Sequence, residues 1–570
     1  MSWSDHFCGT PPRVELFDDI SVLLSRLQRE LEQKPLQAQE IQTTLERLST
    51  DIGFDVALGA ARSCYSGSLV SPLAVRENLE RARKIAQDTY KARHHTPYMH
   101  RNYVFGLDGV SRQFIWSHLH AHPFYNSEQV SQRYKKMSIE NTLIPRLPRK
   151  ARNIFIQCVK QQFYAYERLR DELLLEAACE EYYSRFPSRR SKHKQNLAKI
   201  KKKTQEAARY VIGLNTTAHL YHSINAITLA RYYRLSNQPD TPTEARHIIG
   251  EMVRLVKERD PGIAQLFEDP LPEEELLEHK LLVKVFSEGK DPQLTRQWAQ
   301  EFDEQLEGRV TKLTSYKTNA IPEMLLAVRD MLGVPSYALN DSTILEYLFD
   351  PAHNTHRGDV LTLDHMQKLA RAQIIPHFTF MMKISATADA QEQRQRMTPG
   401  ARPLFEQVIL NTPDFITPSL VQASGPQAIK FYEETMHHTW NARNQLLEMG
   451  VRAELANYLL PNGVALRFRE SVDLLNFKQK DEKRECLNAQ EEIGRLTIAQ
   501  RQEIERVHPE LKGIFGPPCY LRTKAQVKPP CPEGDLFCGV RVWKGLEQDS
   551  SGNLKHPDLA IENIMKQRKF

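Results

Sequence analysis

The chain has 570 residues and a mass of 65.9 kDa, with 41% hydrophobic and 26% charged residues. This composition is typical of a folded globular protein, and the length exceeds what one hydrophobic core usually holds, so we expect at least two domains. The formal net charge of +6 is too small to require a nucleic-acid partner by itself.

No apolar run approaches the ~20 residues that a membrane-spanning helix needs. The N-terminal sequence "MSWSDHFCGT" lacks the basic and then apolar pattern of a secretory signal. Eight cysteines scattered over a long chain suit a reducing compartment better than a disulfide scaffold. We therefore expect a cytoplasmic protein without a membrane partner.

Most of the first half reads as helix, for example the amphipathic stretch Glu40–Gly53. The β-rich run "NYVFGLDGV", which begins at Asn102, predicts a strand. The stretch from Ser184 to Lys203 carries nine lysines and arginines and no acid. It is either a phosphate-backbone contact or a solvated insertion before the next helix. The second reading is favoured because no interleaved aromatic residues support base stacking.

The second half contains another predicted strand, "HFTFMMKIS", from His377 to Ser385. A long helix is expected over Ala428–Gly450, with Gly450 as its C-terminal cap. From Gly516 the sequence becomes rich in proline and cysteine and is expected to form an extended arm. The mixture of long helices and few strands predicts an α+β fold rather than alternating βαβ units.

The two predicted strands begin similar passages, so we interpret the chain as a diverged tandem duplication with a seam near residues 308–320. The predicted ranges are 1–312 for the N-terminal domain, 313–515 for the C-terminal domain and 516–570 for the arm. Each domain is expected to contain a mixed or antiparallel sheet with long helices, and the two are expected to pack as a pseudo-dimer.

Several common site signatures are missing from the sequence. It contains no glycine-rich GxGxxG or GxxxxGK loop, no HExxH and no GxSxG elbow. His118 and His122 of "HLHAH" would share a helix face, but no third ligand is evident. The spacings of Cys519, Cys531 and Cys538 contain no CxxC, so these are read as structural cysteines and no metal site is expected. An anionic ligand would have to be bound mainly by arginine side chains.

One cluster of such donors is "QEQRQRM", from Gln391 to Met397. On a helix Gln391 and Arg394 would lie one turn apart on the same face. A group of donors packed so closely predicts an anionic ligand.

The first half contains His94, Thr96, Pro97 and His100, followed by "GVSR" and "SQRY". In this pattern it resembles the flavin-dependent thymidylate synthase family. The first four residues match a family element that begins Gly-His, although Arg93 replaces the glycine and Met99 a glutamate. "GVSR" (Gly109 to Arg112) and "SQRY" (Ser131 to Tyr134) match outright, and Arg209 and Asn225 keep the separation of a later element. Where the family has Arg-His-Arg, this half reads His120-Ala121-His122, so it lacks both phosphate-binding arginines.

The second half retains what the first has lost. Aligning its strand on the family pattern places Arg394-Gln395-Arg396 on Arg-His-Arg and Gln391 on a substrate-contacting glutamine. Arg484 falls on the last substrate arginine, and "NAQEEI" (Asn488 to Ile493) follows at the family offset. This half lacks the Gly-His element, has "TPGARP" in place of Ser-x-Arg-Tyr, and has Asn457 where the first half has Arg209.

In the resembled family the active site lies between subunits. The two halves of this chain keep complementary residue sets, which predicts a composite site between the repeats, within one chain or across a dimer. The resemblance implies an enzyme that converts dUMP to dTMP with FAD, NADPH and methylenetetrahydrofolate, most simply as a homodimer, and without a covalent enzyme nucleophile.

The implied substrate-binding residues are Ser131, Arg133, Tyr134, Arg209, Gln391, Arg394 and Arg484, of which Arg209 and Arg484 are the candidate catalytic groups. The implied FAD-binding residues are His94, Thr96, Asn225, Arg394, Gln395 and Arg396.

Simpler interpretations of single residues stay open. Arg394 and Arg396 are also explained as solvated helix-face charges, Ser131 as a helix cap and Arg209 as the partner of an acid on its own helix. A non-catalytic protein that binds a nucleotide or flavin is the alternative function. A nucleic-acid-binding protein that uses residues 184–203 is a third, less favoured one.

Overall fold

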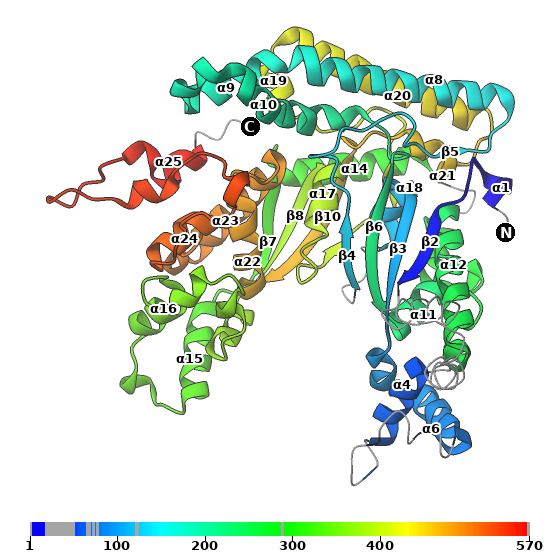
Figure 1. The fold of residues 1–570 in the computed structure, drawn as a ribbon, viewed down its shortest axis with the longest axis horizontal. Coiled ribbons are helices and arrows are strands. Elements are labelled where there is room, and N and C mark those ends of the chain that lie inside the picture. The colour runs from blue at the N-terminus through cyan, green and yellow to red at the C-terminus, as the bar shows by residue number, and fades with distance from the viewer. Residues whose placement is uncertain are drawn as a thin grey trace, which may run out of the picture. The chain divides into compact units, whose positions relative to one another are not determined.

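In a computed structural model of the chain, the described residues are 3–17, 52–63, 66, 70, 75, 79–119, 125–286 and 290–566. They form two compact units, which are described separately (Figure 1). Unit 1 comprises Met1–Gln157, Leu214–Asp291 and Gln445–Leu459. Unit 2 comprises Cys158–Gly213, Pro292–Asn444 and Leu460–Phe570. The predicted helix Glu40–Gly53 lies almost wholly outside the described residues.

Unit 1 is built on an antiparallel four-stranded sheet with the order β2-β3-β6-β4. The strand predicted from Asn102 is confirmed as β3. Its alternating pattern buries Tyr103, Phe105 and Leu107 against a helical layer. That layer contains α11 and α12, which lie beside the sheet in Figure 1. The strand bounds are β2 Arg13–Phe17, β3 Asn102–Ser111, β4 Tyr125–Gln129 and β6 Thr217–Asn225, and the helix bounds are α11 Ala226–Arg234 and α12 Thr243–Arg259.

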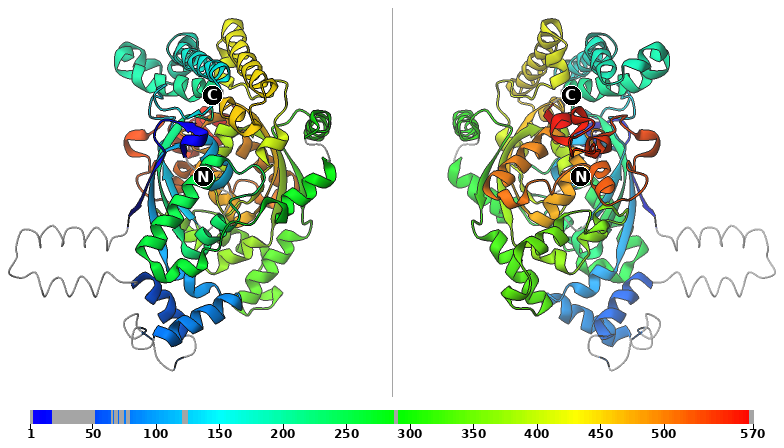
Figure 2. Two further views of the ribbon diagram at one scale, coloured as in Figure 1. Left: turned by 90° about the vertical axis from the view of Figure 1, so that its right-hand side faces the viewer. Right: turned by 90° about the vertical axis from the view of Figure 1, so that its left-hand side faces the viewer.

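The remaining described elements of unit 1 surround this sheet. Helices α4 and α6 lie together in both views of Figure 2, and a 3-10 helix, Thr96–His100, packs against α4. Arg101 fixes the start of β3 through an ion pair with the buried Asp260, 2.9 Å away. The further bounds are α1 Trp3–His6, β1 Phe7–Cys8, α4 Ile52–Ser63, α6 Leu79–Lys91, α7 Arg112–Phe114, β5 Ile144–Pro145 and α13 Leu277–Val285.

Unit 2 contains a second antiparallel sheet with the order β7-β8-β10-β9. The predicted strand His377–Ser385 is confirmed as β8, and it pairs along its whole length with β10 (Ala465–Asp473). The predicted long helix is α20 (Pro426–Glu448), and Gly450 beyond its end has φ +77°, as a left-handed C-terminal cap requires. The further bounds are β7 Thr311–Tyr316, α14 Pro292–Leu306, α15 Ala320–Leu332, α16 Asp341–Phe349, α17 Ala386–Glu392, β9 Gly400–Ala401, α18 Phe405–Val408, α19 Ser419–Ala423, α22 Leu474–Glu485 and α23 Glu491–Val507.

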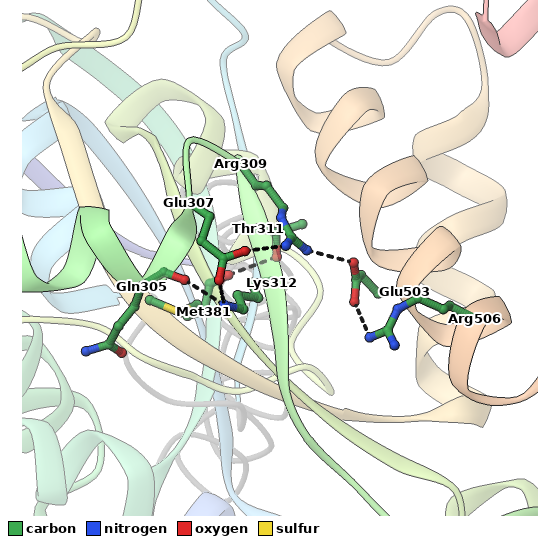
Figure 3. Close-up of polar contacts among 8 residues, drawn as sticks. All are labelled: Gln305, Glu307, Arg309, Thr311, Lys312, Met381, Glu503 and Arg506. Atoms are coloured by element: carbon green, nitrogen blue, oxygen red, sulfur yellow. Dashed lines mark hydrogen bonds and ion pairs between the residues drawn. The ribbon is translucent and has the colours of Figure 1, made fainter.

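The start of β7 is tied to its neighbours by the polar contacts shown in Figure 3. The hydroxyl of Thr311 donates to the carbonyl of Met381 on β8 (2.9 Å), and Arg309 pairs with Glu503 on α23 (3.2 Å). Glu503 also accepts from Arg506 (2.8 Å). Arg309 and Arg506 are largely exposed, so these ion pairs orient the strand more than they stabilise the fold.

The two sheets have the same plan. When the four strands of each sheet are numbered by their order in the chain, both sheets have the spatial order 1-2-4-3, with the first and third strands at the edges. β6 and β10 have nine residues each, and α12 and α23 have 17 residues each. The residue numbers of both pairs differ by a constant 248, so the segments between strand and helix, which contain α11 and α22, also have equal length.

The units exchange short segments, and their limits therefore differ from the predicted ranges 1–312 and 313–515. The 3-10 helix Arg209–Val211 belongs to unit 2, where Gly463 N–H donates to the carbonyl of Tyr210 (2.8 Å). The 3-10 helix Asn457–Leu459 belongs to unit 1, where Asn215 N–H donates to the carbonyl of Tyr458 (3.0 Å). The unit limits also fall inside α8 (Arg149–Arg168) and α20, and α21 (Ala453–Ala456) lies in unit 1.

Two other predicted segments differ from expectation. The basic run does not precede a helix. After the end of α9 (Leu175–Arg185) it forms a 3-10 helix (Pro187–Lys192) and most of α10 (His193–Ala208), and Lys201 pairs there with Asp171 (3.2 Å). The segment from residue 516, predicted as an extended arm, contains the short helices α24 (Pro518–Lys524) and α25 (Ile561–Lys566) and belongs to unit 2. None of the helices among the described residues is long and apolar enough to span a membrane.

Candidate functional site

The side-chain amide of Gln490 is the centre of a polar network in unit 2. Its Oε1 accepts hydrogen bonds from Nη2 of Arg209 and from Nε2 of Gln391, while its Nε2 donates to the hydroxyl of Tyr210. Gln490 and Arg209 are almost fully buried. An arginine and a glutamine from distant parts of the chain are thus aimed at one point by a third side chain.

A second set of contacts fixes Tyr210. Its hydroxyl donates to Oε2 of Glu492, whose two carboxyl oxygens also accept from the N–H (2.7 Å) and the hydroxyl (2.6 Å) of Ser385. Burial raises the pKa of Glu492, and the hydrogen bonds from Ser385 and Tyr210 oppose that rise. Ser385 also caps α17, because its hydroxyl accepts from the N–H of Ala388 (3.1 Å). The network therefore ends on the helix that carries Gln391.

Arg484 reaches the same helix from α22. Its Nη2 donates to the backbone carbonyl of Gln391 (2.5 Å), which also accepts from the N–H of Arg394 (3.2 Å). Gln391 and Arg394 do not share a helix, since α17 ends at Glu392 and Arg394 lies in the following turn. The turn still leaves the side chains of Arg394 and Arg396 exposed, as binding of an anionic ligand from solvent requires.

A buried charge cluster supports this end of α17. Lys480 lies on α22, one turn before Arg484, and its ammonium group pairs with Glu392 and with Glu470 (2.5 Å); all three side chains are fully buried. Burial raises the pKa of Glu470 to about 7. Lys480 opposes this rise, but the negative charge of Glu392, which shares the same ammonium group, adds to it. Burial alone would also raise the pKa of Glu392, but Lys480 and Arg484 lower it. Glu392 therefore stays ionised beside the candidate site.

Arg402 provides a second support that the sequence did not single out. It lies in the "TPGARP" segment, and its guanidinium makes a two-pronged contact with the fully buried Asp389 of α17 (2.7 to 3.0 Å). Because Asp389 is on the same helix as Gln391, this ion pair fixes the helix that presents the amide.

A small cavity of about 20 Å³ opens beside Gln490 in unit 2. Its volume suffices for one water molecule and not for a pyrimidine ring. The cavity is lined by Lys203, Glu206, Ala207, Tyr210, Pro418, Leu420, Gln490 and Glu491.

The predicted phosphate-binding residues of the first half lie in unit 1. Ser131 begins a tight turn, in which its hydroxyl accepts from the N–H of Arg133 (3.3 Å) and its carbonyl from the N–H of Tyr134 (3.2 Å). This geometry makes Ser131 the start of a turn and not a helix cap. Arg133 stacks over the ring of Tyr134 at 5.6 Å, and the Tyr134 side chain is half exposed. A cation, a hydroxyl and an aromatic ring therefore occupy one accessible turn.

The predicted flavin-contacting residues of the first half also lie in unit 1. His94 and Thr96 are exposed at the start of the 3-10 helix Thr96–His100, whereas Asn225 caps α11 by accepting from the N–H of Thr228 (2.9 Å). Arg93, which replaces the glycine of the family element, has φ +63°. The backbone at Arg93 therefore has a left-handed conformation, which glycine adopts more easily than arginine.

Four cysteines line one cavity in unit 2. These are Cys519, Cys531 and Cys538, as read from the sequence, together with Cys486 at the end of α22. Burial raises the pKa of the Cys519 thiol to about 12 and that of Cys486 to about 11, so both are protonated at neutral pH. Among the described residues, no group of three or more histidine, cysteine, aspartate or glutamate side chains is arranged to hold a metal ion. His120 and His122 lie outside the described residues.

The structure thus brings Arg209, Gln391 and Arg484 together in unit 2, with Arg394, Gln395 and Arg396 on the adjoining turn. It places the other predicted residues in unit 1. The model of one protein family, described as thymidylate synthase complementing protein, matches residues 49–262 and 366–510 of the chain. The chain belongs to the thymidylate synthase complementing protein family.

The two matched segments of this family contain the residues of the network from both halves, with Arg209 in the first and Gln391 and Gln490 in the second. Three relatives are each named a flavin-dependent thymidylate synthase. The protein of Clostridium tetani is 28% identical over 211 residues, which cover 36% of this chain and 79% of the relative. That of Sulfolobus acidocaldarius is 33% identical over 139 residues, 24% of this chain and 52% of the relative. That of Geobacter sulfurreducens is 27% identical over 188 residues, 31% and 75%.

Sequence reasoning missed Tyr210, Gln490 and Glu492 as parts of the site. The signal was present, because Gln490 and Glu492 lie in the stretch "NAQEEI", which matched the family's pattern. What the sequence does not show is that these side chains join Arg209, some 281 residues away, to Gln391.

Proposed function

We propose that this chain is a flavin-dependent thymidylate synthase, which converts dUMP to dTMP with methylenetetrahydrofolate as the one-carbon donor. The proposal rests mainly on one observation, the convergence of Arg209 from the first half with Gln391 and Arg484 from the second. Both halves match the same family, and the relatives are named for this activity.

Duplication explains why two halves contribute to the site. The equal strand order and the constant spacing of 248 residues support two copies of one module, each of which has lost part of its original site. We propose that Ser131 and Arg133 complement Arg394 and Arg484 around the substrate phosphate, within one chain or across a homodimer.

The donors present suit a flavin cofactor. Exposed cationic groups on the turn after α17, Arg394 and Arg396, match the anionic pyrophosphate of FAD, and Gln395 adds an amide. His94, Thr96 and Asn225 would supply the neutral contacts, although Met99 in place of a glutamate removes one acceptor. The bound flavin, reduced by NADPH, would supply the hydride that converts the transferred one-carbon unit to a methyl group.

The residues of the chain then act on dUMP itself. Arg209 is held by Gln490 in a buried position, where a fixed positive charge stabilises negative charge that develops on the uracil ring more strongly than it would in water. Arg484 donates to the backbone carbonyl of Gln391, and these two residues would orient the nucleotide against the charge of Arg209. No covalent nucleophile is required of the protein.

The decisive experiment is conversion of deuterium- or tritium-labelled dUMP by the purified chain with FAD, NADPH and methylenetetrahydrofolate. We expect release of the label from the uracil ring and formation of dTMP. A yellow protein without turnover would support the alternative, a flavin-binding protein that has lost catalysis. Activity that survives neutralisation of the exposed Lys192, Lys194 and Lys199 would argue against nucleic-acid binding by the basic run as the main role.

The composite site predicts the effect of two single substitutions in different units. Arg394→Ala and Arg133→Ala should each weaken dUMP binding by at least about tenfold, since each removes a charge-assisted contact of roughly 1.5–3 kcal/mol. Isothermal titration with dUMP measures the affinities, and Arg254→Ala, an exposed arginine on α12, is the matched control. Normal turnover by either the Arg394 or the Arg133 variant would contradict the composite site.

A further inference from the structure

In unit 2 a serine and a tyrosine, Ser385 and Tyr210, donate to the buried carboxyl group of Glu492, and we call this set a carboxyl frame. The frame around Glu492 has a counterpart with the same hydrogen bonds in unit 1. There Glu244 accepts from the N–H of Ser111 (2.7 Å), from the Ser111 hydroxyl and from the hydroxyl of Tyr458 (2.7 Å). Each of these bonds uses the same atoms as the bonds of Ser385 and Tyr210 to Glu492. Both carboxyl groups are buried, and both tyrosines come from an exchanged 3-10 helix.

The residues that surround the two frames differ in a consistent way. At the constant spacing of 248 residues, Gln490 corresponds to Pro242, Arg209 to Asn457 and Arg484 to Ser236. Gln490 and Pro242 have nearly the same backbone conformation at the start of their helices, with φ and ψ of −58° and 141° against −56° and 144°. The backbone of the position is therefore retained in unit 1, but proline has no amide to bind a neighbour.

The direction of each hydrogen bond in unit 2 explains what the frame does. The hydroxyl of Tyr210 donates its hydrogen bond to Glu492. The lone pairs of that hydroxyl therefore face Nε2 of Gln490 and accept from it. An amide that donates with Nε2 must turn Oε1 the other way, toward Arg209 and Gln391. Arg209 and Gln391 are both donors and favour the same orientation, so the contact of Nε2 with the Tyr210 hydroxyl, which Glu492 fixes, completes the set of bonds that holds the amide in this position.

We propose that unit 2 holds the one competent nucleotide site of the chain, with Gln490, Tyr210 and Glu492 as its positioning residues, and that the frame of unit 1 is a scaffold only. The inference rests on the proposed function and deepens it. It assigns one dUMP per chain, although the fold carries two equivalent frames. Unit 1 would contribute Ser131 and Arg133 to that site, without a second site of its own.

The chain itself provides a matched pair of variants. Tyr210→Phe and Tyr458→Phe each remove one buried hydroxyl that bonds to a buried glutamate, so both should lower the melting temperature by a similar amount. Only Tyr210→Phe should affect the nucleotide. We expect its Kd for dUMP to rise by about tenfold or more, and that of Tyr458→Phe to stay within about twofold of the unmodified chain.

The measurement is isothermal titration of the flavin-loaded chain with dUMP, well below the melting temperature of every variant. The unmodified chain should bind one dUMP. If Tyr210→Phe does not fold, Gln490→Leu, which keeps the carboxyl–tyrosine frame, gives the same test. Two dUMP per chain, or equal losses of affinity in the two tyrosine variants, would overturn the inference while the proposed function stands. Absence of any dUMP binding by the unmodified chain would overturn both.

Discussion

Arg93 has a backbone conformation that is unfavourable for any residue with a Cβ. The family element that the sequence resembles has glycine at this position, and the arginine that replaces it here has φ +63°. This conformation costs roughly 1–2 kcal/mol for a residue with a Cβ.

Arg93→Gly should therefore stabilise unit 1. We expect the free energy of unfolding to rise by about 1 kcal/mol, because glycine adopts this conformation without a steric penalty but loses more backbone entropy on folding. Denaturant unfolding measures the change. Arg93→Ala is the control, since alanine keeps the penalty; an equal gain from alanine would show that removal of the arginine side chain, and not relief of the backbone, is responsible.

At the scale of elements, α17 is the part of the site that depends most on buried charge. Its Asp389 is fully buried and is bound by Arg402 through a two-pronged ion pair. Arg402→Ala would leave that carboxylate without this cation, which typically costs about 3–5 kcal/mol. We expect a large fall in thermal stability and, because Gln391 is on the same helix, weaker dUMP binding at temperatures where the variant is still folded.

The control for Arg402 is Arg254→Ala on α12. Arg254 also binds two carboxylates, but its side chain is 49% exposed, so its removal should cost less than about 1 kcal/mol. Similar costs in the two variants would mean that burial of Asp389 does not determine the strength of its ion pair.

The same helix shows what could be predicted from the sequence. The strand before it, β8, was predicted to the residue because apolar side chains fill the run and Ser385 ends it. The end of α17 could not be predicted, because the run "QEQRQRM" has no residue that forbids a helix. The helix ends at Glu392, where Lys480 and Arg402, from other segments, bind carboxylates of its last turns. Buried ion pairs between distant segments leave no local periodic pattern, and for that reason Gln490 and Tyr210 were identified only from the structure.

At the scale of the whole molecule, the exchange of segments has a consequence for folding. Unit 2 contains Cys158–Gly213 from the first half, and unit 1 contains Gln445–Leu459 from the second. Each half therefore carries the tyrosine that completes the buried carboxyl frame of the other unit. A half produced alone has a buried glutamate without its tyrosine donor, which costs ~1–3 kcal/mol out of a typical domain stability of ~5–15 kcal/mol, and an exchanged segment without its binding partner, which lowers the stability further.

We expect fragments 1–291 and 292–570 to be unstable and inactive when expressed singly, and to copurify as an active complex when expressed together. Copurification, circular dichroism and dUMP turnover measure assembly, folding and activity. The control is a chain folded intact and then cleaved at a protease site inserted between Asp291 and Pro292, which has the same break but has already exchanged its segments. This control should stay assembled and active. A single fragment that folds cooperatively and binds dUMP alone would show that the exchanged segments are dispensable, and that each half is a self-sufficient domain.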